Sequence, residues 1–151
     1  MAICLDTSAL AKLYHQEAGS TVVEELLTKV DAIFVARLGI LEMHSVLSGK
    51  VRSKELTEAA SELARRMFRS EVRKRRVKVV PLLVRHYEHA ETLIATYGTR
   101  QGLRALDSLQ LAVALDLQRN NLIDSFVTAD KLLCAVAPLE GLAVIDPTLR
   151  V

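Results

Sequence analysis

Short apolar runs alternate with longer helical patterns along this chain, and this alternation limits the possible folds more than any other feature. The runs are AICL, AIFVAR, VKVVPLL, SFVTAD and LAVID, at residues 2–5, 32–37, 77–83, 125–130 and 142–146. Because they lack a continuous polar face, we expect strands that are covered on both sides. Such strands, separated by helices, predict an α/β fold: a three-layer α/β/α sandwich around a central, mainly parallel sheet.

The segments between these runs have the spacing or the composition of helices. Helices are predicted at residues 8–14, 19–30, 38–51, 53–76, 84–98, 103–121 and 131–139, and 53–76 could form one long helix or a pair. Gly98 is expected to end its helix, with a loop at 99–102. The 151 residues match the size of one ordinary domain, and no linker or repeat divides them, so a single domain at 1–151 is predicted.

Composition excludes several classes of protein. Half of the residues are hydrophobic and a quarter are charged, which is typical of a compact globular chain and not of a disordered one. No apolar run is long enough to span a membrane. The first residues lack the basic start and the cleavage site of a signal peptide. We therefore expect a cytoplasmic protein with no membrane partner.

Four carboxylates stand where the surrounding hydrophobicity does not predict them. Asp6 and Asp130 follow apolar runs, Glu42 interrupts GILEMHSVL, and Asp107 interrupts LRALDSLQLAVAL. An ionised carboxylate that is buried alone is costly, so each acid needs a partner. In an open parallel sheet the ligand lies outside the carboxyl ends of the strands, which is the position expected for Asp6.

Each acid also has an ordinary structural explanation. Asp6, Thr7 or Ser8 could cap the first helix, and Asp130 could cap the helix that follows it. Arg104 lies three residues before Asp107 and could form an ion pair with it. Taken singly, the acids do not distinguish a functional site from helix capping.

Together, the acids predict a metal site. Two at strand ends and two near the starts of apolar helices could converge at one edge of the sheet, where they would repel one another without a cation. Oxygen ligands favour a hard ion, Mg²⁺ or Mn²⁺. Such an ion lowers the pKa of bound water and stabilises the charge that develops on an attacked phosphodiester. A site of this kind needs no covalent nucleophile.

The motifs that carry these acids resemble those of the PIN-domain family, specifically the VapC-type toxins of bacterial and archaeal toxin–antitoxin pairs. The resemblance rests on LDTSALAKLY, LGILEMHSVLSG, FVTADKLL and, most specifically, LRALDSLQLA, and it covers almost the whole chain. By motif, the three most characteristic metal-site acids of the family correspond to Asp6, Glu42 and Asp107. The more variable fourth acid corresponds to Asp130. The small polar residues that support the site correspond to Ser8 and Thr128.

This resemblance implies both an activity and a set of partners. It implies a PIN-like fold and a Mg²⁺- or Mn²⁺-dependent endoribonuclease, with Asp6, Glu42, Asp107 and Asp130 as catalytic and metal-binding residues. It also implies an RNA substrate, a homodimer, and a small VapB-like antitoxin that docks near the active site.

A basic run departs from the family pattern by its density. Residues 65–78 contain eight basic residues and one acid. Arg73, Lys74, Arg75 and Arg76 could follow the phosphate backbone of RNA, which would make binding depend on salt. The alternative is a solvated helix end, where basic side chains are also favourable.

Three other functions also fit parts of the sequence. A PIN-like module could bind RNA or a protein without cutting, but the presence of all four acids argues against a degenerate site. His86 and His89 are three residues apart on a helix, yet they lack the spacing of a zinc motif. A Mg²⁺-binding signalling receiver would need an aspartate at the end of a middle strand, and VKVVPLL has none.

Overall fold

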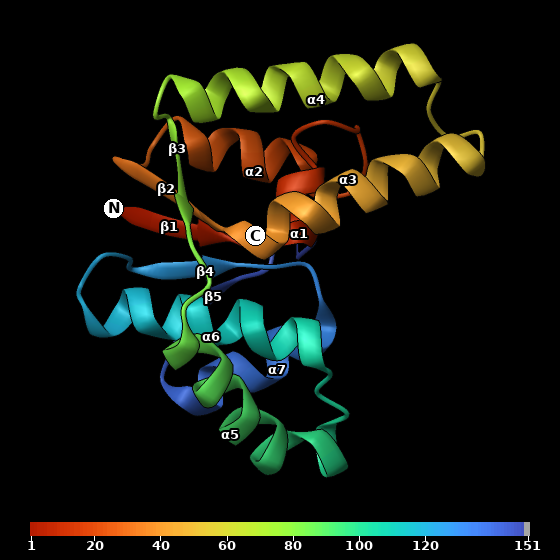
Figure 1. The fold of residues 1–151 in the computed structure, drawn as a ribbon. Coiled ribbons are helices and arrows are strands. Elements are labelled where there is room, and N and C mark those ends of the chain that lie inside the picture. Colours follow the sequence, from red (N-terminus) through yellow and green to blue (C-terminus); the bar gives the residue numbers. More distant parts are fainter. Residues whose placement is uncertain (150–151) are drawn as a thin grey trace.

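Five parallel strands form one sheet, in the order β3–β2–β1–β4–β5, in the computed structural model (Figure 1). The strands are β1 (Ala2–Leu5), β2 (Ala32–Ala36), β3 (Val77–Val80), β4 (Ser125–Val127) and β5 (Val144–Ile145). The structure describes residues 1–149, so residues 150–151 of the predicted domain lie outside the described part. The predicted sheet is confirmed, and every described strand pairing is parallel.

Helices cover both faces of this sheet. In Figure 1, α2, α3 and α4 lie on one side of the strands and α5, α6 and α7 on the other. The helices are α1 (Thr7–Ala11), α2 (Ser20–Leu27), α3 (Arg37–Arg52), α4 (Glu58–Arg73), α5 (Val84–Gln101), α6 (Ala105–Arg119), α7 (Lys131–Val136) and the 3₁₀ turn η1 (Ala137–Glu140). The predicted three-layer α/β/α sandwich is therefore confirmed.

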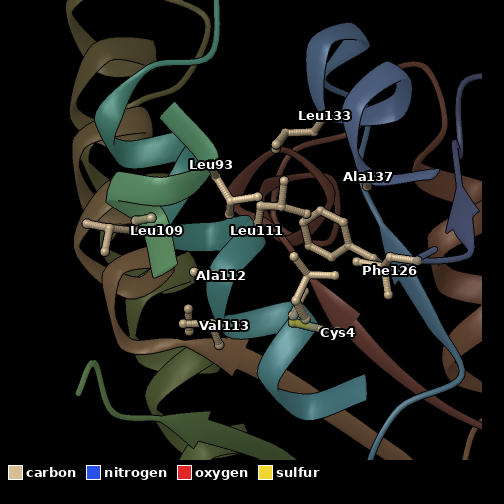
Figure 2. Packing of buried hydrophobic residues seen from close by; sticks show 14 of the residues in the cluster. Cys4, Leu93, Leu109, Leu111, Ala112, Val113, Phe126, Leu133 and Ala137 are labelled. Carbon is tan, nitrogen blue, oxygen red and sulfur yellow. The ribbon is translucent and has the colours of Figure 1, made fainter. Parts of the chain in front are cut away.

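Two apolar cores hold the layers together, one on each face. Alternate residues of β1 point to opposite sides, because successive side chains of a strand do so. Ile3 and Leu5 pack with Met43 of α3 and Phe68 of α4. Cys4 packs into the other core, which also holds the labelled residues Leu93, Leu111 and Phe126 of Figure 2. The strands are apolar throughout because both of their faces are buried.

The end of α5 differs from the prediction. Gly98 does not stop the helix, which continues to Gln101 and ends at Gly102, in the left-handed conformation with φ of 77°. Gly102 N donates to Gly98 O at 3.0 Å. Gly98 lies instead at a crowded point inside α5, where a Cβ would stand 3.1 Å from Ile94 Cγ2. The predicted loop at 99–102 is therefore wrong for residues 99–101, which are helical.

Of the segment 53–76, residues 58–73 form a single long helix, α4, while 53–57 and 74–76 are not helical. Thr57 caps this helix by accepting from Ala60 N at 3.1 Å. Strand β3 ends at Val80, directly before Pro81, which has no N–H to donate to a sheet ladder. Within residues 1–149, none of the helices combines the length and the apolarity that a membrane crossing requires.

Candidate active site

The four predicted acids line one pocket at the switch point of the sheet. The strand order places β2 and β3 on one side of β1 and places β4 and β5 on the other, so the switch point lies between β1 and β4. Ligands of open α/β sheets bind at such a point, outside the carboxyl ends of the strands. A pocket of ≈ 330 Å³ there is lined by Asp6, Glu42, Asp107 and Asp130. Residues far apart in the sequence thus meet in one cavity.

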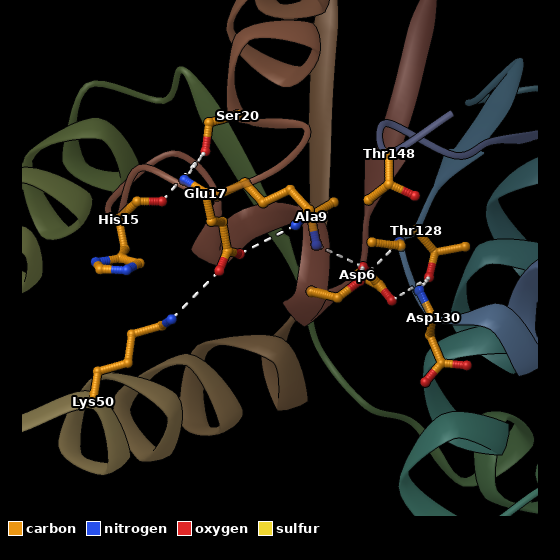
Figure 3. Close-up of polar contacts among 12 residues, drawn as sticks. Asp6, Ala9, His15, Glu17, Ser20, Lys50, Thr128, Asp130 and Thr148 are labelled. Atoms are coloured by element: carbon orange, nitrogen blue, oxygen red, sulfur yellow. Dashed lines mark hydrogen bonds and ion pairs between the residues drawn. The ribbon is translucent and has the colours of Figure 1, made fainter. Parts of the chain in front are cut away.

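Asp6 is the most buried of these acids, at 3% exposure, and three donors hold its carboxylate. Ser8 Oγ and Ala9 N donate to its Oδ1 at 2.7 and 2.9 Å, and Thr128 Oγ1 donates to its Oδ2 at 2.5 Å (Figure 3). Ser8 Oγ also accepts from Ala129 N at 2.9 Å, which ties the end of β1 to the end of β4. Asp6 therefore caps α1 and lines the pocket at the same time.

Burial and mutual repulsion raise the pKa of two of these acids. Burial raises the pKa of Asp6 to about 6, against the lowering effect of its hydrogen bonds from Thr128, Ser8 and Ala9, and the charge of Asp130 adds to the increase. Burial also raises the pKa of Asp107, as do the charges of Asp130 and Glu42, while Arg104 lowers it. The acids are thus close enough to oppose one another's ionisation, which a bound cation would relieve.

Asp130 and Asp107 each have the structural partner that the sequence suggested. Asp130 Oδ1 accepts from Leu132 N and Leu133 N at 2.8 and 3.0 Å, and so caps α7. Arg104 Nε lies 4.0 Å from Asp107 Oδ2, but the Arg104 side chain is 84% exposed. An exposed pair at this distance contributes little, so Arg104 does not neutralise Asp107.

Gln110 holds Glu42, and the sequence reasoning missed this residue. Gln110 Nε2 donates to Glu42 Oε1 and to Thr7 Oγ1, both at 3.0 Å. Its Oε1 is buried and has no hydrogen-bond partner within residues 1–149. Gly39 of α3 leaves room for this amide, since a Cβ there would stand 3.2 Å from Gln110 Nε2. The sequence feature that could have pointed to Gln110 is an amide side chain among apolar residues, about one helical turn after Asp107.

Basic residues line another part of the same pocket, and the sequence reasoning missed them too. Lys12 and Lys50 are pocket residues, as is Glu17, with which both form ion pairs. In Figure 3, Glu17 and Lys50 lie on one side of Asp6, whereas Thr128 and Asp130 lie on the other. The sequence feature that could have pointed to Lys12 as a pocket residue is its position within an apolar stretch, shortly after Asp6.

The donor set fits a hard divalent cation, although the side chains are not arranged around one. Within the described residues, no three His, Cys, Asp or Glu side chains are grouped as metal ligands. The acids of the pocket nevertheless offer only carboxylate oxygens, which Mg²⁺ and Mn²⁺ prefer. Burial is the main cause of the raised pKa values of Asp6 and Asp107, and neighbouring acids add to it, so a bound cation would favour the ionised form of both.

The other residues singled out from the sequence lie elsewhere. The run Arg73–Arg76 joins the end of α4 to the start of β3. It therefore lies at the amino ends of the parallel strands, whereas the pocket lies at their carboxyl ends. Arg75 and Arg76 line a separate cavity beside Ala32 and Val77. His86 is buried, with its Nε2 2.7 Å from Asp116 Oδ2, and His89 contacts Arg119 instead of sharing a site with His86.

A protein-family model matches most of the chain, and several solved structures share its fold. The family model for the PIN domain matches residues 3–144. VapC20 from Mycobacterium tuberculosis, described as a sarcin-ricin loop cleaving toxin, is 16% identical, with a TM-score of 0.67 and 99% of both chains covered. VapBC2 from Rickettsia felis, solved with a DNA fragment from its promoter, is 17% identical, with a TM-score of 0.64 over 96% of this chain and 98% of that one.

A third solved structure, FitAcB from Neisseria gonorrhoeae, is 14% identical, with a TM-score of 0.63 over 96% of this chain and 97% of that one. The comparison with curated proteins finds no match. At these identities the structural similarities establish the fold.

Proposed function

The chain belongs to the PIN domain family, and we propose that it is a Mg²⁺- or Mn²⁺-dependent endoribonuclease, the toxin of a VapBC-like toxin–antitoxin pair. The observation that carries this proposal is the convergence of Asp6, Glu42, Asp107 and Asp130 in one pocket at the switch point of the sheet. A divalent cation supplies, when bound, an acidified water and a counter-charge for the phosphodiester under attack.

The chain's own residues would fix and orient this site. Asp6 is held by Ser8, Ala9 and Thr128, so its carboxylate is positioned before any ligand arrives. Glu42 is oriented by Gln110. Asp107 lies in the first turn of α6, and Asp130 is fixed at the start of α7. The four acids would hold the cation, and none needs to form a covalent bond with the RNA.

Cleavage of a mixed RNA pool by the purified protein, with Mg²⁺, Mn²⁺ or EDTA, tests the proposed function. We expect cleavage with either ion and none in EDTA. The same cleavage in EDTA as in Mg²⁺ would overturn metal dependence. RNA that is bound but not cut under any of these conditions would favour the rival reading, a PIN-like module that binds without cleaving.

The partners are part of the same proposal. Structures related in fold include the VapBC2 and FitAcB proteins, and several apolar side chains of this chain are exposed, such as Leu41, Val84 and Tyr87. We propose that this chain acts in the cytoplasm as a homodimer, and that a small antitoxin inhibits it. Co-purification with the product of a neighbouring small reading frame, with loss of ribonuclease activity in the complex, tests the antitoxin proposal.

Gln110→Leu is expected to lower cleavage by about tenfold to a hundredfold, because losing a side chain that orients a metal ligand typically has an effect of this size. Stability should change by no more than about 1 kcal/mol, since leucine also removes the unpartnered Oε1. RNA cleavage in Mn²⁺ and urea unfolding measure the two effects, with the exposed Gln101→Leu as control. Mn²⁺ titration by calorimetry shows whether metal affinity falls together with cleavage. Unchanged Mn²⁺ affinity and cleavage would contradict this role of Gln110.

Arg73, Lys74, Arg75 and Arg76 are proposed to contact RNA that extends beyond the pocket, because they lie at the far edge of the sheet. Replacing all four with Gln should weaken binding of a long single-stranded RNA and flatten its salt dependence, and should leave a short oligonucleotide unaffected. Filter binding at several salt concentrations measures both. Equal losses for the long and the short RNA would contradict the proposal.

A further inference from the structure

Two lysines from different elements meet at one carboxylate inside the acid-lined pocket. Lys12 follows the last residue of α1, and Lys50 lies in the last turn of α3. Lys12 Nζ is 3.1 Å from Glu17 Oε1, and Lys50 Nζ is 3.4 Å from Glu17 Oε2. Lys50 also reaches the exposed Glu55 at 3.5 Å. All three distances are longer than the roughly 2.7–2.9 Å of strong charge-assisted hydrogen bonds, and the two made by Lys50 are the longest, so Lys50 is loosely held.

Both lysine side chains are largely buried, and their ammonium groups have unused hydrogen-bond donors. The Lys12 side chain is 8% exposed and that of Lys50 is 14% exposed. An ammonium group has three N–H donors. Within residues 1–149, Lys12 Nζ makes one hydrogen bond and Lys50 Nζ makes two. A further acceptor that enters the pocket can therefore bind without breaking the existing pairs.

The charges in the pocket are segregated. Asp6, Glu42, Asp107 and Asp130 suit a cation, whereas Lys12 and Lys50 outnumber the one carboxylate, Glu17, that lies between them in the pocket. The second carboxylate near Lys50, Glu55, is 53% exposed and is screened by water. Asp146 also lies near Lys12, since hydrogen bonds from Thr148 and the charge of Lys12 both lower its pKa. Because both lysines keep unused N–H donors, this end of the pocket can still accept an anion beside the acids.

We propose that Lys12 and Lys50 bind a second phosphate of the RNA, adjacent to the phosphate that is cleaved. This inference rests on the proposed ribonuclease function, and it defines the substrate as a strand with at least two successive phosphates. A purely structural ion pair explains the feature less well. Burying two ammonium groups that share Glu17, with only the partly exposed Glu55 and Asp146 nearby, costs more than apolar side chains would, unless a further anion completes the pairing.

The test measures binding of a fluorescent 12-nucleotide single-stranded RNA of mixed sequence, in Mg²⁺, on an Asp107→Asn background that prevents cleavage. Lys12→Met and Lys50→Met should each weaken binding about tenfold, the value expected for a charged hydrogen bond. Each should also reduce the slope of log affinity against log salt by about 0.7. The control is Lys29→Met, an exposed lysine beyond α2, which removes the same charge.

Glu17→Gln separates phosphate binding from a structural role. Removing the competing carboxylate should tighten RNA binding if the lysines hold phosphate, even though it weakens the ion pairs and lowers thermal stability. A structural role predicts lower stability and no gain in affinity. Thermal melting of each variant shows that the binding change is not caused by unfolding.

The outcomes separate this inference from the proposed function. Metal-dependent cleavage by the unmodified protein, together with lysine variants that bind like Lys29→Met, would overturn the second phosphate site alone. Weaker binding in both lysine variants, without cleavage by the unmodified protein, would support the phosphate site and overturn the nuclease. Weaker RNA binding by Glu17→Gln would overturn the inference.

Discussion

Asp107→Asn is expected to abolish metal-dependent RNA cleavage and, at the same time, to stabilise the metal-free protein. The carboxylate of Asp107 lines the pocket, and its pKa is raised by burial and by the charges of Asp130 and Glu42. Loss of a group that merely orients a ligand costs about 10- to 100-fold in activity, so loss of a ligand should cost at least a hundredfold. Removing the charge also removes repulsion, which favours the folded state without metal.

Three measurements check this pair of effects. Cleavage of an RNA pool in Mn²⁺ gives the activity, urea unfolding in EDTA gives the stability, and the rise in melting temperature on adding Mn²⁺ reports metal binding. The rise should be present in the unmodified protein and much smaller in Asp107→Asn. Glu91→Gln on the exposed side of α5 is the charge-matched control. Full cleavage by Asp107→Asn would contradict the proposal that Asp107 is a metal ligand at the active site.

The four acids could be identified from the sequence as candidate site residues, because a carboxylate within an apolar segment is unusual. Asp107 and Glu42 interrupt apolar helices, and Asp6 follows a buried strand, so each demanded an explanation. The strand and helix alternation then placed Asp6 at the carboxyl edge of a parallel sheet. The structure adds that helix capping and site formation are not alternatives, since Asp6 and Asp130 both do the first while lining the pocket.

The residues that support the acids could not be predicted in the same way. Gln110 reaches Glu42 across 68 residues of sequence, and a contact of that kind depends on how α6 packs beside α3. Lys12 and Lys50 converge only because α1 and α3 lie side by side. A single lysine near the end of a helix is ordinary in sequence, and its burial in a shared pocket is visible only in three dimensions.

The basic run, Arg73–Arg76, was conspicuous in the sequence, but its location in the fold could not be predicted from it. Its density in the sequence suggested RNA contact, but position in the sequence says nothing about which edge of the sheet it occupies. Helix α4 runs back to the start of β3, so Arg73–Arg76 lie at the amino edge. Gly98 illustrates the same limit locally: a glycine ends a helix only where the chain takes a left-handed turn, and here that residue is Gly102.

Asp6→Asn is expected to make the metal-free protein progressively more stable than the unmodified protein as the pH rises. The folded pKa of Asp6 is about 6, above its ordinary value of 3.8, because the side chain is buried. Between these two values the folded state binds a proton that the unfolded state has lost. The contribution of Asp6 to stability is therefore full below the lower value and declines until the pH passes the higher one.

The size of this effect follows from the two pKa values. Each pKa unit corresponds to about 1.4 kcal/mol, so an ionised Asp6 should cost the metal-free fold about 3 kcal/mol near neutral pH. Asn has nearly the same shape but does not ionise, and so the stability difference between the two proteins should grow from near zero at pH 4 to about that value at pH 7.

Urea unfolding in EDTA, at pH values from 4 to 8, measures this difference directly. Every other titrating group is common to the two proteins, so the subtraction isolates Asp6 as long as its neighbours keep their contacts. Saturating Mn²⁺ should then reverse the order at neutral pH, because the ion stabilises only the protein that can ligate it. A difference that does not change with pH would mean that the pKa of Asp6 in the folded protein is the same as in the unfolded chain, near its ordinary value of 3.8. In that case the three donors to the Asp6 carboxylate would offset the effect of burial, and the folded protein would not need a cation at Asp6 to remain stable.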